Sequence, residues 1–266
     1  MKQLAYIFFL LVLLSSCEQV IDVELNESDP RLVIEASFNL LEDGSANSMV
    51  KLTTTAPFFD EQIPYVTDAV VLVTSNNGGS FSFAYTEDGI YQSDLIPELG
   101  IDYTLEITYN NETYIAIQQL VETVSYEFIE QEDDGGFLGD EIELKAFFTD
   151  PGGIENHYFF EVLSERGNEY DTASDEFFDG NQIFALYFAD DLDTGDEVIF
   201  NLYGVDEQFF NFMFVLLQQG SDDTGGPFET QPATVRGNII NTTNPDHFPL
   251  GYFRISEVST LNYIVQ

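Results

Sequence analysis

The chain has 266 residues, of which 7 are Lys or Arg and 48 are Asp or Glu, so its formal net charge is -41. This balance excludes a nucleic-acid-binding protein, because neutralising phosphates requires clustered Lys and Arg. Hydrophobic residues make up 44% of the chain and aromatic residues 15%, too much apolar surface for a disordered acidic tail. The length fits one large all-β unit or two domains of roughly 100–150 residues each.

The chain begins with the pattern of a bacterial export signal. Lys2 precedes an apolar run at 4–14, which is shorter than the ~20 residues that span a bilayer as a helix. The Leu-Ser-Ser-Cys tetrapeptide at 14–17 resembles a lipobox, whose cysteine carries fatty acyl chains such as palmitate and becomes the mature N-terminus. We therefore predict a lipoprotein signal peptide at 1–16 and lipidation of Cys17, the only cysteine in the chain.

An acylated Cys17 implies anchoring in the bacterial envelope. Residue 18 is Glu, whereas an Asp there retains lipoproteins in the inner membrane of enteric bacteria, so we expect the outer membrane, on its outer or its periplasmic face. A chance cysteine beside an ordinary cleavage site is the alternative. Because an exported chain without a second cysteine forms no internal disulfide, its stability has to come from packing and hydrogen bonds.

The first half of the mature chain is predicted to be β structure. Residues 17–30 are acidic and end at Pro30, so we expect a tether between the lipid and the first strand. Beyond it, apolar and polar residues alternate, as in half-buried antiparallel strands. The predicted strands are 32–38, 49–54, 69–74, 80–85, 102–109 and 114–121. Turn clusters such as Asn-Asn-Gly-Gly separate them, so we predict an immunoglobulin- or transthyretin-like β-sandwich for 31–121.

The second half, 122–266, also shows a period of two and is predicted to form a second antiparallel β-sandwich-like domain. Its expected strands are 141–146, 157–163, 183–188, 197–202, 236–240 and 251–265. The segment 206–219 differs, because Asp206 can cap the start of a helix and Gly220 can close its end. This segment is apolar almost all round, so we expect a buried helix, covered by a sheet or by a partner.

A series of short motifs runs along the whole mature chain. They are the lipobox, Arg31-Leu-Val-Ile-Glu-Ala, Asp68-Ala-Val-Val-Leu-Val, Gly89-Ile-Tyr-Gln-Ser, the Asp206 helix, Pro227-Phe228, Gly237-Asn238-Ile239 and Leu250-Gly251-Tyr252-Phe253. Their order and spacing resemble an uncharacterised family of Bacteroidetes-type outer-membrane lipoproteins, which is known only as a domain of unknown function. The resemblance implies an envelope lipoprotein often encoded beside a TonB-dependent receptor, as a partner in uptake, and it implies no catalytic residues.

Candidate catalytic groups are few. The chain has two histidines and no nucleophile elbow, P-loop or dinucleotide-binding glycine motif. His157 lies in a β-like aromatic run, where we expect a packed or hydrogen-bonded role. His247 follows Asp246 in a loop, and the sequence leaves open a Ser-His-Asp triad, as it does a glycosidase-type carboxylate pair. We therefore expect a non-enzymatic protein, with a hydrolase as the less favoured alternative.

Acidic loops suggest calcium. Half of the acidic residues lie between 127 and 207, and Asp-rich loops that contain Gly supply the oxygen ligands that calcium takes. The ligands expected for such a site are Asp190, Asp191, Asp193 and Asp196. Their spacing differs from that of an EF-hand, so a solvated acidic loop is the alternative, and no other cofactor is expected.

Together these features predict an outer-membrane-anchored lipoprotein that serves as a non-enzymatic binding or accessory subunit of a TonB-dependent uptake receptor. A surface adhesin or a calcium-stabilised structural protein is the alternative. Removing residues 1–16 removes Lys2 and no acidic residue, so maturation makes the chain more acidic. Such a surface stays soluble and favours cationic cargo, although a saline habitat would explain the same composition.

Overall fold

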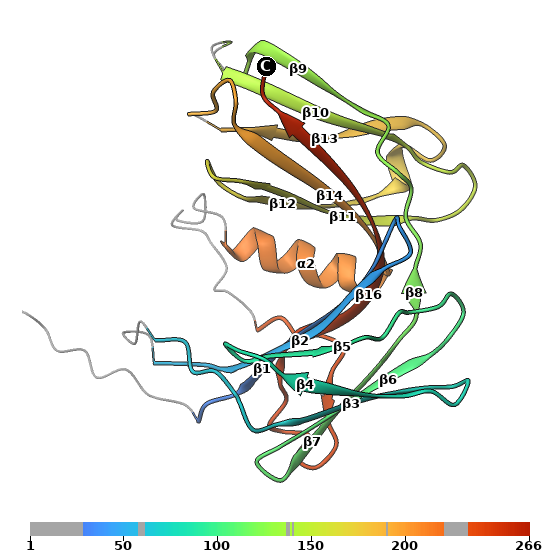
Figure 1. Ribbon diagram of the computed structural model, residues 1–266, viewed down its shortest axis with the longest axis vertical. Helices are drawn as coiled ribbons and strands as arrows, with labels where there is room; N and C mark the ends of the chain where they lie inside the picture. The colour runs from blue at the N-terminus through green and yellow to red at the C-terminus, as the bar shows by residue number, and fades with distance from the viewer. Residues whose placement is uncertain (1–28, 58–61, 137–138, 140, 190, 221–233) are drawn as a thin grey trace, which may run out of the picture.

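The computed structural model describes residues 29–57, 62–136, 139, 141–189, 191–220 and 234–266 (Figure 1). The predicted signal peptide, Cys17 and the tether up to residue 28 lie outside these ranges, as does Asp190. The described part of the chain is mainly β and contains one α-helix, which confirms the predicted fold class.

The first sandwich combines strands of the N-terminal half with one short strand from near the C-terminus. They are β1 (Leu32–Leu41), β2 (Ala46–Thr54), β3 (Val70–Ser75), β4 (Ser80–Tyr85), β5 (Ile90–Ser93), β6 (Tyr103–Tyr109), β7 (Glu112–Gln118) and β15 (Ile240–Asn241). One layer contains β1, β2 and β5, the other contains β3, β6, β7 and β15, and β4 pairs with both β5 and β3. Each strand predicted between residues 31 and 121 is present, whereas the four-residue β5 is too short for its period to be recognised.

Alternation decides which side chains enter the first core. In β6, Tyr103, Leu105 and Ile107 are at most 2% exposed, while Glu106 between them faces the solvent. They belong to the same buried cluster as Phe38 of β1. Full burial of an apolar side chain of this size contributes roughly 1.5–3 kcal/mol, which is the main source of stability in a chain with a single cysteine.

The second sandwich is built from the middle of the chain. Its elements are β9 (Phe128–Gly135), β10 (Glu141–Thr149), β11 (His157–Ser164), β12 (Glu169–Ser174), the 3₁₀ helix η1 (Asp175–Phe177), β13 (Gln182–Phe188) and β14 (Glu197–Val205). A three-stranded sheet in the order β13-β10-β9 covers the layer β12-β11-β14. Phe148 of β10, Phe160 of β11 and Phe200 of β14 meet in its core.

The 15-residue strand β16 (Leu250–Ile264) joins the two sandwiches. It pairs in parallel with β1 from Leu250 to Val258, and antiparallel with β14 from Val258 to Ile264. Figure 1 shows β16 as one curved strand that runs from the lower sandwich to the upper one. The largest sheet of the described chain therefore continues through both sandwiches.

Several expectations differ from this arrangement. The sequence does not predict β9 and β12, and of the strand predicted at 236–240 only Ile240 lies in a strand, the short β15. The pairing of β16 with β1, and with the short β8 (Leu120–Val121), is parallel, although the sequence predicts antiparallel sheets throughout. The predicted second domain, 122–266, also overlaps the first sandwich, because Ile239, Phe253 and Ile255 belong to the first core. The period of a strand shows which residues share a face, but it does not show which strand lies beside it.

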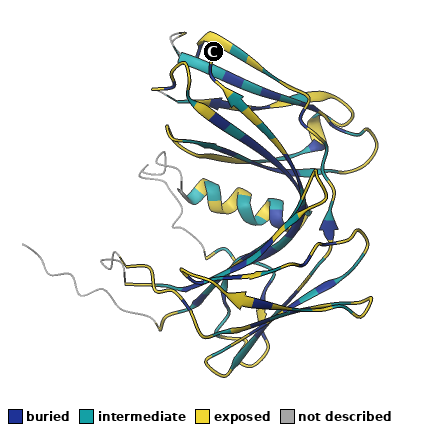
Figure 2. Ribbon diagram, viewed as in Figure 1, coloured by how far each residue is buried: buried dark blue, intermediate teal, exposed yellow. Residues whose placement is uncertain are grey.

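The helix α2 (Glu207–Gly220) lies on the side of the shared sheet opposite to the two cores (Figure 1). Asp206 caps it, since the backbone N–H of Phe209 donates to Asp206 Oδ1 at 2.6 Å. Only Phe209 of its first turn is buried, against Tyr252 of β16 and Phe159 of β11, and the other residues of 207–219 are intermediate or exposed (Figure 2). The helix is thus as predicted, but its burial is not: Phe209 is 5% exposed, whereas Phe214 is 47% exposed.

Candidate functional site

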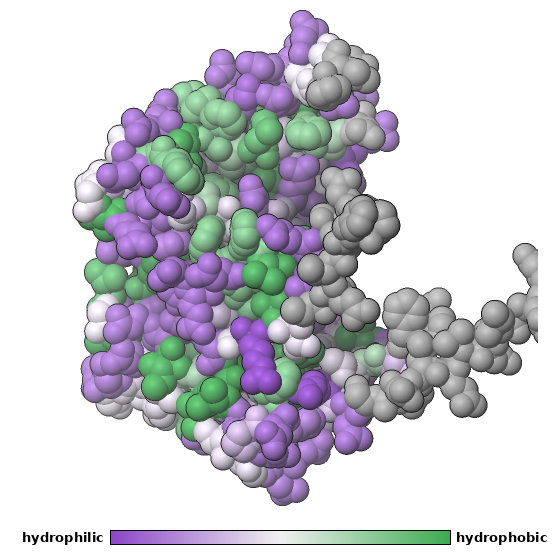
Figure 3. All heavy atoms as spheres, turned by 180° about the vertical axis from the view of Figure 1, so that it is seen from behind, coloured by the Kyte–Doolittle hydropathy of each residue, from purple (hydrophilic) through white to green (hydrophobic). Residues whose placement is uncertain are grey.

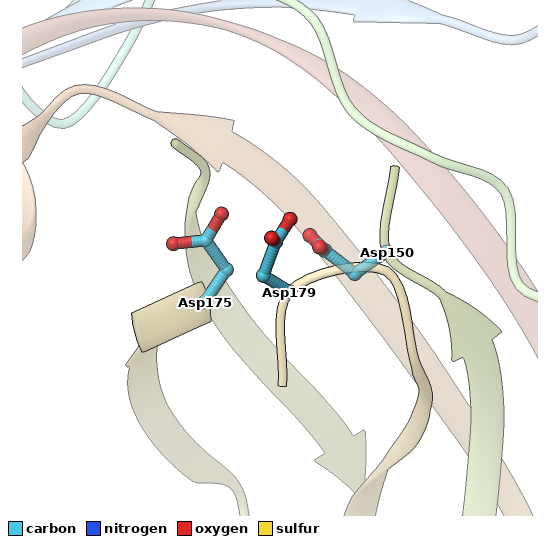
Figure 4. Close-up of side chains that lie close together, drawn as sticks. All are labelled: Asp150, Asp175 and Asp179. Atoms are coloured by element: carbon cyan, nitrogen blue, oxygen red, sulfur yellow. The ribbon is translucent and has the colours of Figure 1, made fainter. Parts of the chain in front are cut away.

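Three carboxylates come together at one end of the second sandwich. Asp150 follows β10, Asp175 opens η1, and Asp179 lies in the loop before β13. Each offers an oxygen within 4.8 Å of an oxygen of the other two. Figure 4 shows the three side chains side by side, with Asp179 between the others.

Two loops position these carboxylates by hydrogen bonds to each other. From the first loop, the N–H of Gly153 donates to Asp179 Oδ1 at 2.6 Å, and the N–H of Asn156 donates to Asp175 Oδ2 at 2.8 Å. From the second loop, the N–H of Gly180 donates to Asp150 Oδ2 at 2.9 Å. Gly180 has a φ of +73°, and a Cβ added there would lie 3.2 Å from the Gly152 Cα, so a side chain at this position would strain the turn.

The cluster is negative and largely enclosed. Asp150 is 2% exposed and Asp175 is 6% exposed, while Asp179 is exposed. The Tyr158 hydroxyl donates to Asp150 Oδ1 at 2.6 Å, and burial, followed by this hydrogen bond to a carboxylate, raises the pKa of Tyr158. Among the described residues, no Lys or Arg forms an ion pair with the three carboxylates. A hard divalent cation such as calcium, which takes six to eight oxygen ligands, would balance this charge.

The calcium ligands predicted from the sequence are arranged differently. Asp196 forms a two-point ion pair with Arg166, at 2.7 Å to Nε and 3.2 Å to the terminal nitrogen, and also accepts the N–H of Asp193. Within the described residues, Asp191, Asp193 and Asp196 do not form a group whose carboxylate oxygens lie within 4.8 Å of one another. Asp190 lies outside these residues. None of Asp150, Asp175 and Asp179 is among the predicted ligands, and in the sequence Asp150 is marked only by the Pro-Gly-Gly turn that follows it.

His247 lies in a separate polar cluster in the first sandwich. Its Nδ1 is 3.0 Å from Glu112 Oε2, which also accepts hydrogen bonds from the Tyr114 hydroxyl at 2.6 Å and the Asn241 amide at 3.0 Å. The other ring nitrogen, Nε2, is buried and has no hydrogen-bond partner among the described residues. A hydrolytic triad needs a serine hydroxyl at that nitrogen, and the described part of the chain places none there.

The second histidine is packed, as expected. The ring of His157 lies 5.1 Å from that of Phe210 on α2, measured between centroids, and the residue is half-buried. This ring contact packs α2 against β11.

An open groove forms a further candidate site. Its volume is about 1060 Å³, and it is lined by residues of β11, β12, β13 and the C-terminal end of α2. This groove was not predicted from the sequence. Its only signal there is that residues 183–188 are apolar at every position, where a strand with one buried face would alternate. Elsewhere, apolar residues form separate clusters among hydrophilic ones, as Figure 3 shows for the rear face.

These features define the class of the protein: two β-sandwiches joined by a shared sheet, with a capped helix and an open groove in the second. The chain belongs to the family described as Domain of unknown function (DUF4249), which it matches over residues 18–262, and this confirms the predicted membership in an uncharacterised family. No curated protein matches the chain.

A likeness to one solved structure is weak. A two-domain fibronectin type-III segment from chicken tenascin aligns with 66% of this chain and 91% of its own, at 12% identity and a TM-score of 0.22. This value is too low to support an argument about function. Within the described residues, no helix combines the length and the apolar character needed to cross a membrane.

Proposed function

We propose that this protein is a non-enzymatic binding subunit of the bacterial envelope, attached by lipid at Cys17 to the outer membrane and associated with a TonB-dependent uptake receptor. The observation that carries the binding role is the open groove of the second sandwich, because its apolar lining has no covering element in the described chain. The lipobox-like residues 14–17 support the anchor, and the resemblance of the chain to envelope lipoproteins supports the receptor as partner.

The proposal predicts co-purification of a receptor with the anchored protein. Tagged wild-type chain would be extracted from outer membranes in detergent, and the bound proteins would be identified by mass spectrometry. We expect a TonB-dependent receptor with the wild-type chain and strong depletion of it with Cys17→Ser, since losing the acyl chains removes the anchor. If the wild-type chain is membrane-bound but no receptor accompanies it, the partnership is wrong. If Cys17→Ser remains fully membrane-bound, the anchor is wrong.

A second candidate is a calcium-stabilised structural or adhesion protein, which the carboxylates of Asp150, Asp175 and Asp179 favour. A ligand that binds only the folded state stabilises it by about 2.7 kcal/mol at 100 times its Kd. We therefore expect calcium, compared with sodium at equal ionic strength, to raise the Tm by several degrees. The exposed Asp179→Asn should abolish this shift, whereas Asp191→Asn, in the loop predicted from the sequence, should preserve it. An unchanged Tm in calcium would exclude this candidate.

A further inference from the structure

The groove lies between two strands that each have a free edge. Within the described sheets, β12 pairs only with β11, and β13 pairs only with β10. Both strands line the groove, together with Leu216 and Leu217 of α2. A free edge presents unpaired backbone N–H and C=O groups, to which an extended peptide can add as a further strand.

The free strand β13 is apolar on both faces. Ala185 and Tyr187 are buried in the second core, while Phe184, Leu186 and Phe188 are 40–43% exposed. All three exposed side chains line the groove. Exposed edge strands are usually protected by charged or bulged positions, so this run of exposed apolar side chains indicates a surface that a partner covers.

The opposite wall of the groove carries negative charge. In the β11–β12 ladder, Glu169 pairs with Val162 and Asp171 pairs with Phe160. Paired residues of adjacent strands project to the same face, so both carboxylates share the face of the apolar groove lining. Burial, followed by the nearby Asp171, raises the pKa of Glu169, as expected for carboxylates that lack a cationic partner.

The neighbouring cation does not neutralise this wall. Lys145 lies 5.6 Å from the centre of the Phe184 ring, but its amino group is held by Glu143 at 2.6 Å and Glu132 at 3.1 Å. No Lys or Arg is among the residues that line the groove. The groove therefore combines an apolar strand on one side with uncompensated carboxylates on the other.

We propose that this groove binds an extended peptide segment of a partner protein, in which apolar and cationic side chains alternate, as an added strand on the free edge of β13. The proposal rests on the binding function proposed above and specifies the chemistry of the partner. Apolar side chains of the segment would contact Leu186 and Phe188, and its cationic side chains would pair with Glu169 and Asp171. A second copy of this chain is a poor occupant, because two molecules of net charge -41 repel each other.

Binding of a synthetic peptide tests this proposal. The probe is a fluorescent Lys-Val-Lys-Val-Lys-Val-Lys peptide, titrated with the full-length protein in nonionic detergent at about 150 mM salt and followed by fluorescence anisotropy. We expect saturable binding that is at least tenfold tighter than that of the Glu-Val-Glu-Val-Glu-Val-Glu peptide. Glu169→Gln should weaken binding of the Lys peptide several-fold, since it removes one carboxylate from the groove wall.

A matched pair of substitutions separates the groove from the general charge of the protein. Leu186→Lys places a cation in the groove and should weaken binding at least tenfold. Val70→Lys makes a comparable change at a residue of the first sandwich that is 67% exposed, and should alter binding less than twofold. Circular dichroism would confirm folding, and Leu216→Lys, on the helix side of the groove, replaces Leu186→Lys if the latter fails to fold.

Three outcomes would overturn the proposal: no saturable binding of the Lys peptide, equal binding of the Glu peptide, or equal weakening by Leu186→Lys and Val70→Lys. These measurements need neither membrane nor receptor. Failure here therefore leaves the lipid anchor and the receptor partnership standing, and failure to co-purify a receptor leaves the groove chemistry standing.

Discussion

Glu112 illustrates how one carboxylate connects distant parts of the first sandwich. The hydrogen bond from the Tyr114 hydroxyl, followed by that to His247, lowers the pKa of Glu112 from 4.5 to about 2. Asn241 and His247 reach it from a segment about 130 residues further along the chain. The carboxylate thereby fixes the loop after β15 to β7.

The lowered pKa makes this contribution dependent on pH. Because the folded-state pKa lies below the ordinary value, the stabilisation is fully present above about pH 4.5 and is lost as the pH falls towards 2. Glu112→Gln should lower the free energy of unfolding by about 1–3 kcal/mol at pH 7, and the difference from wild type should shrink between pH 4.5 and 2. Urea unfolding at several pH values measures both.

The exposed Glu106 on β6 provides the control for this prediction. Glu106→Gln should change the free energy of unfolding by no more than about 0.5 kcal/mol at any of these pH values. An equal loss for Glu112→Gln at pH 7 and near pH 2 would show that its carboxylate charge is not what stabilises the cluster.

The carboxylates of the candidate calcium site show which parts of a site can be predicted from the sequence. Asp175 and Asp179 lie close together in an acidic loop that the sequence makes conspicuous, and their separation of four residues brings both to one turn. Asp150 is 25 residues earlier, and only the packing of two loops brings it to them. In the loop predicted to bind calcium, by contrast, Arg166 draws Asp196 into an ion pair. Proximity along the chain is therefore not sufficient to bring carboxylates together, because a nearby cation can hold one of them in an ion pair.

At the scale of elements, the buried aromatic contacts of α2 come from its N-terminal turns. Phe209 packs edge-to-face with Tyr252 of β16 at 5.1 Å and with Phe159 of β11 at 5.6 Å, between ring centroids. The guanidinium of Arg254 lies 5.8 Å from the centre of the Phe209 ring and 4.3 Å from the centre of the Tyr203 ring. Aromatic contacts of this geometry add to the hydrophobic burial of the ring.

This attachment predicts a steep difference between two phenylalanines of the same helix. Phe209→Ala should lower the free energy of unfolding by about 3–5 kcal/mol, because it empties a buried site. Phe214→Ala, at a position 47% exposed, should cost clearly less. Chemical unfolding followed by far-UV circular dichroism measures both variants. Equal losses would mean that the two ends of the helix are held equally firmly.

The limits of helix prediction follow from the same contacts. Asp206 as the cap and the uninterrupted apolar run are local features, so the helix and its bounds could be predicted. Which turns are covered depends on the sheet beneath, where Tyr252, Phe159 and Tyr203 come from three different strands. The helix predicted from this apolar run is therefore confirmed, whereas the burial predicted for its whole length is not found.

At the scale of the whole molecule, most of the cations in the described part of the chain are held in internal contacts. Arg31 and Arg236 both lie over the Phe248 ring, at 4.0 and 3.8 Å from its centre, and Lys145 and Arg166 pair with acids of their own sandwich. Arg254 lies between β16 and α2, where burial lowers its pKa. The acidic surface is consequently left largely without compensating charge, which is the basis for the cationic partner proposed for the groove.

Polar contacts also fix the two sandwiches to each other. The Ser259 hydroxyl of β16 donates to Glu42 Oε1 at 2.7 Å, and the Gln118 amide of β7 donates to Asp206 Oδ2 at 2.7 Å. Together with the shared strand β16, these bonds cross the domain boundary that was predicted at residue 122. The two halves are therefore connected by a continuous sheet as well as by the chain.

The sequence by itself determined the β class, most of the strands and the capped helix, because alternation and capping are local patterns. Tertiary structure alone decided that β16 joins both sandwiches, that Asp150 meets Asp175 and Asp179, and that β12 and β13 leave a groove open. The physical reason is that a strand's pattern specifies its faces and not its neighbours. Backbone pairing depends little on side-chain identity, so edges, partners and convergent sites emerge only when the whole chain has packed.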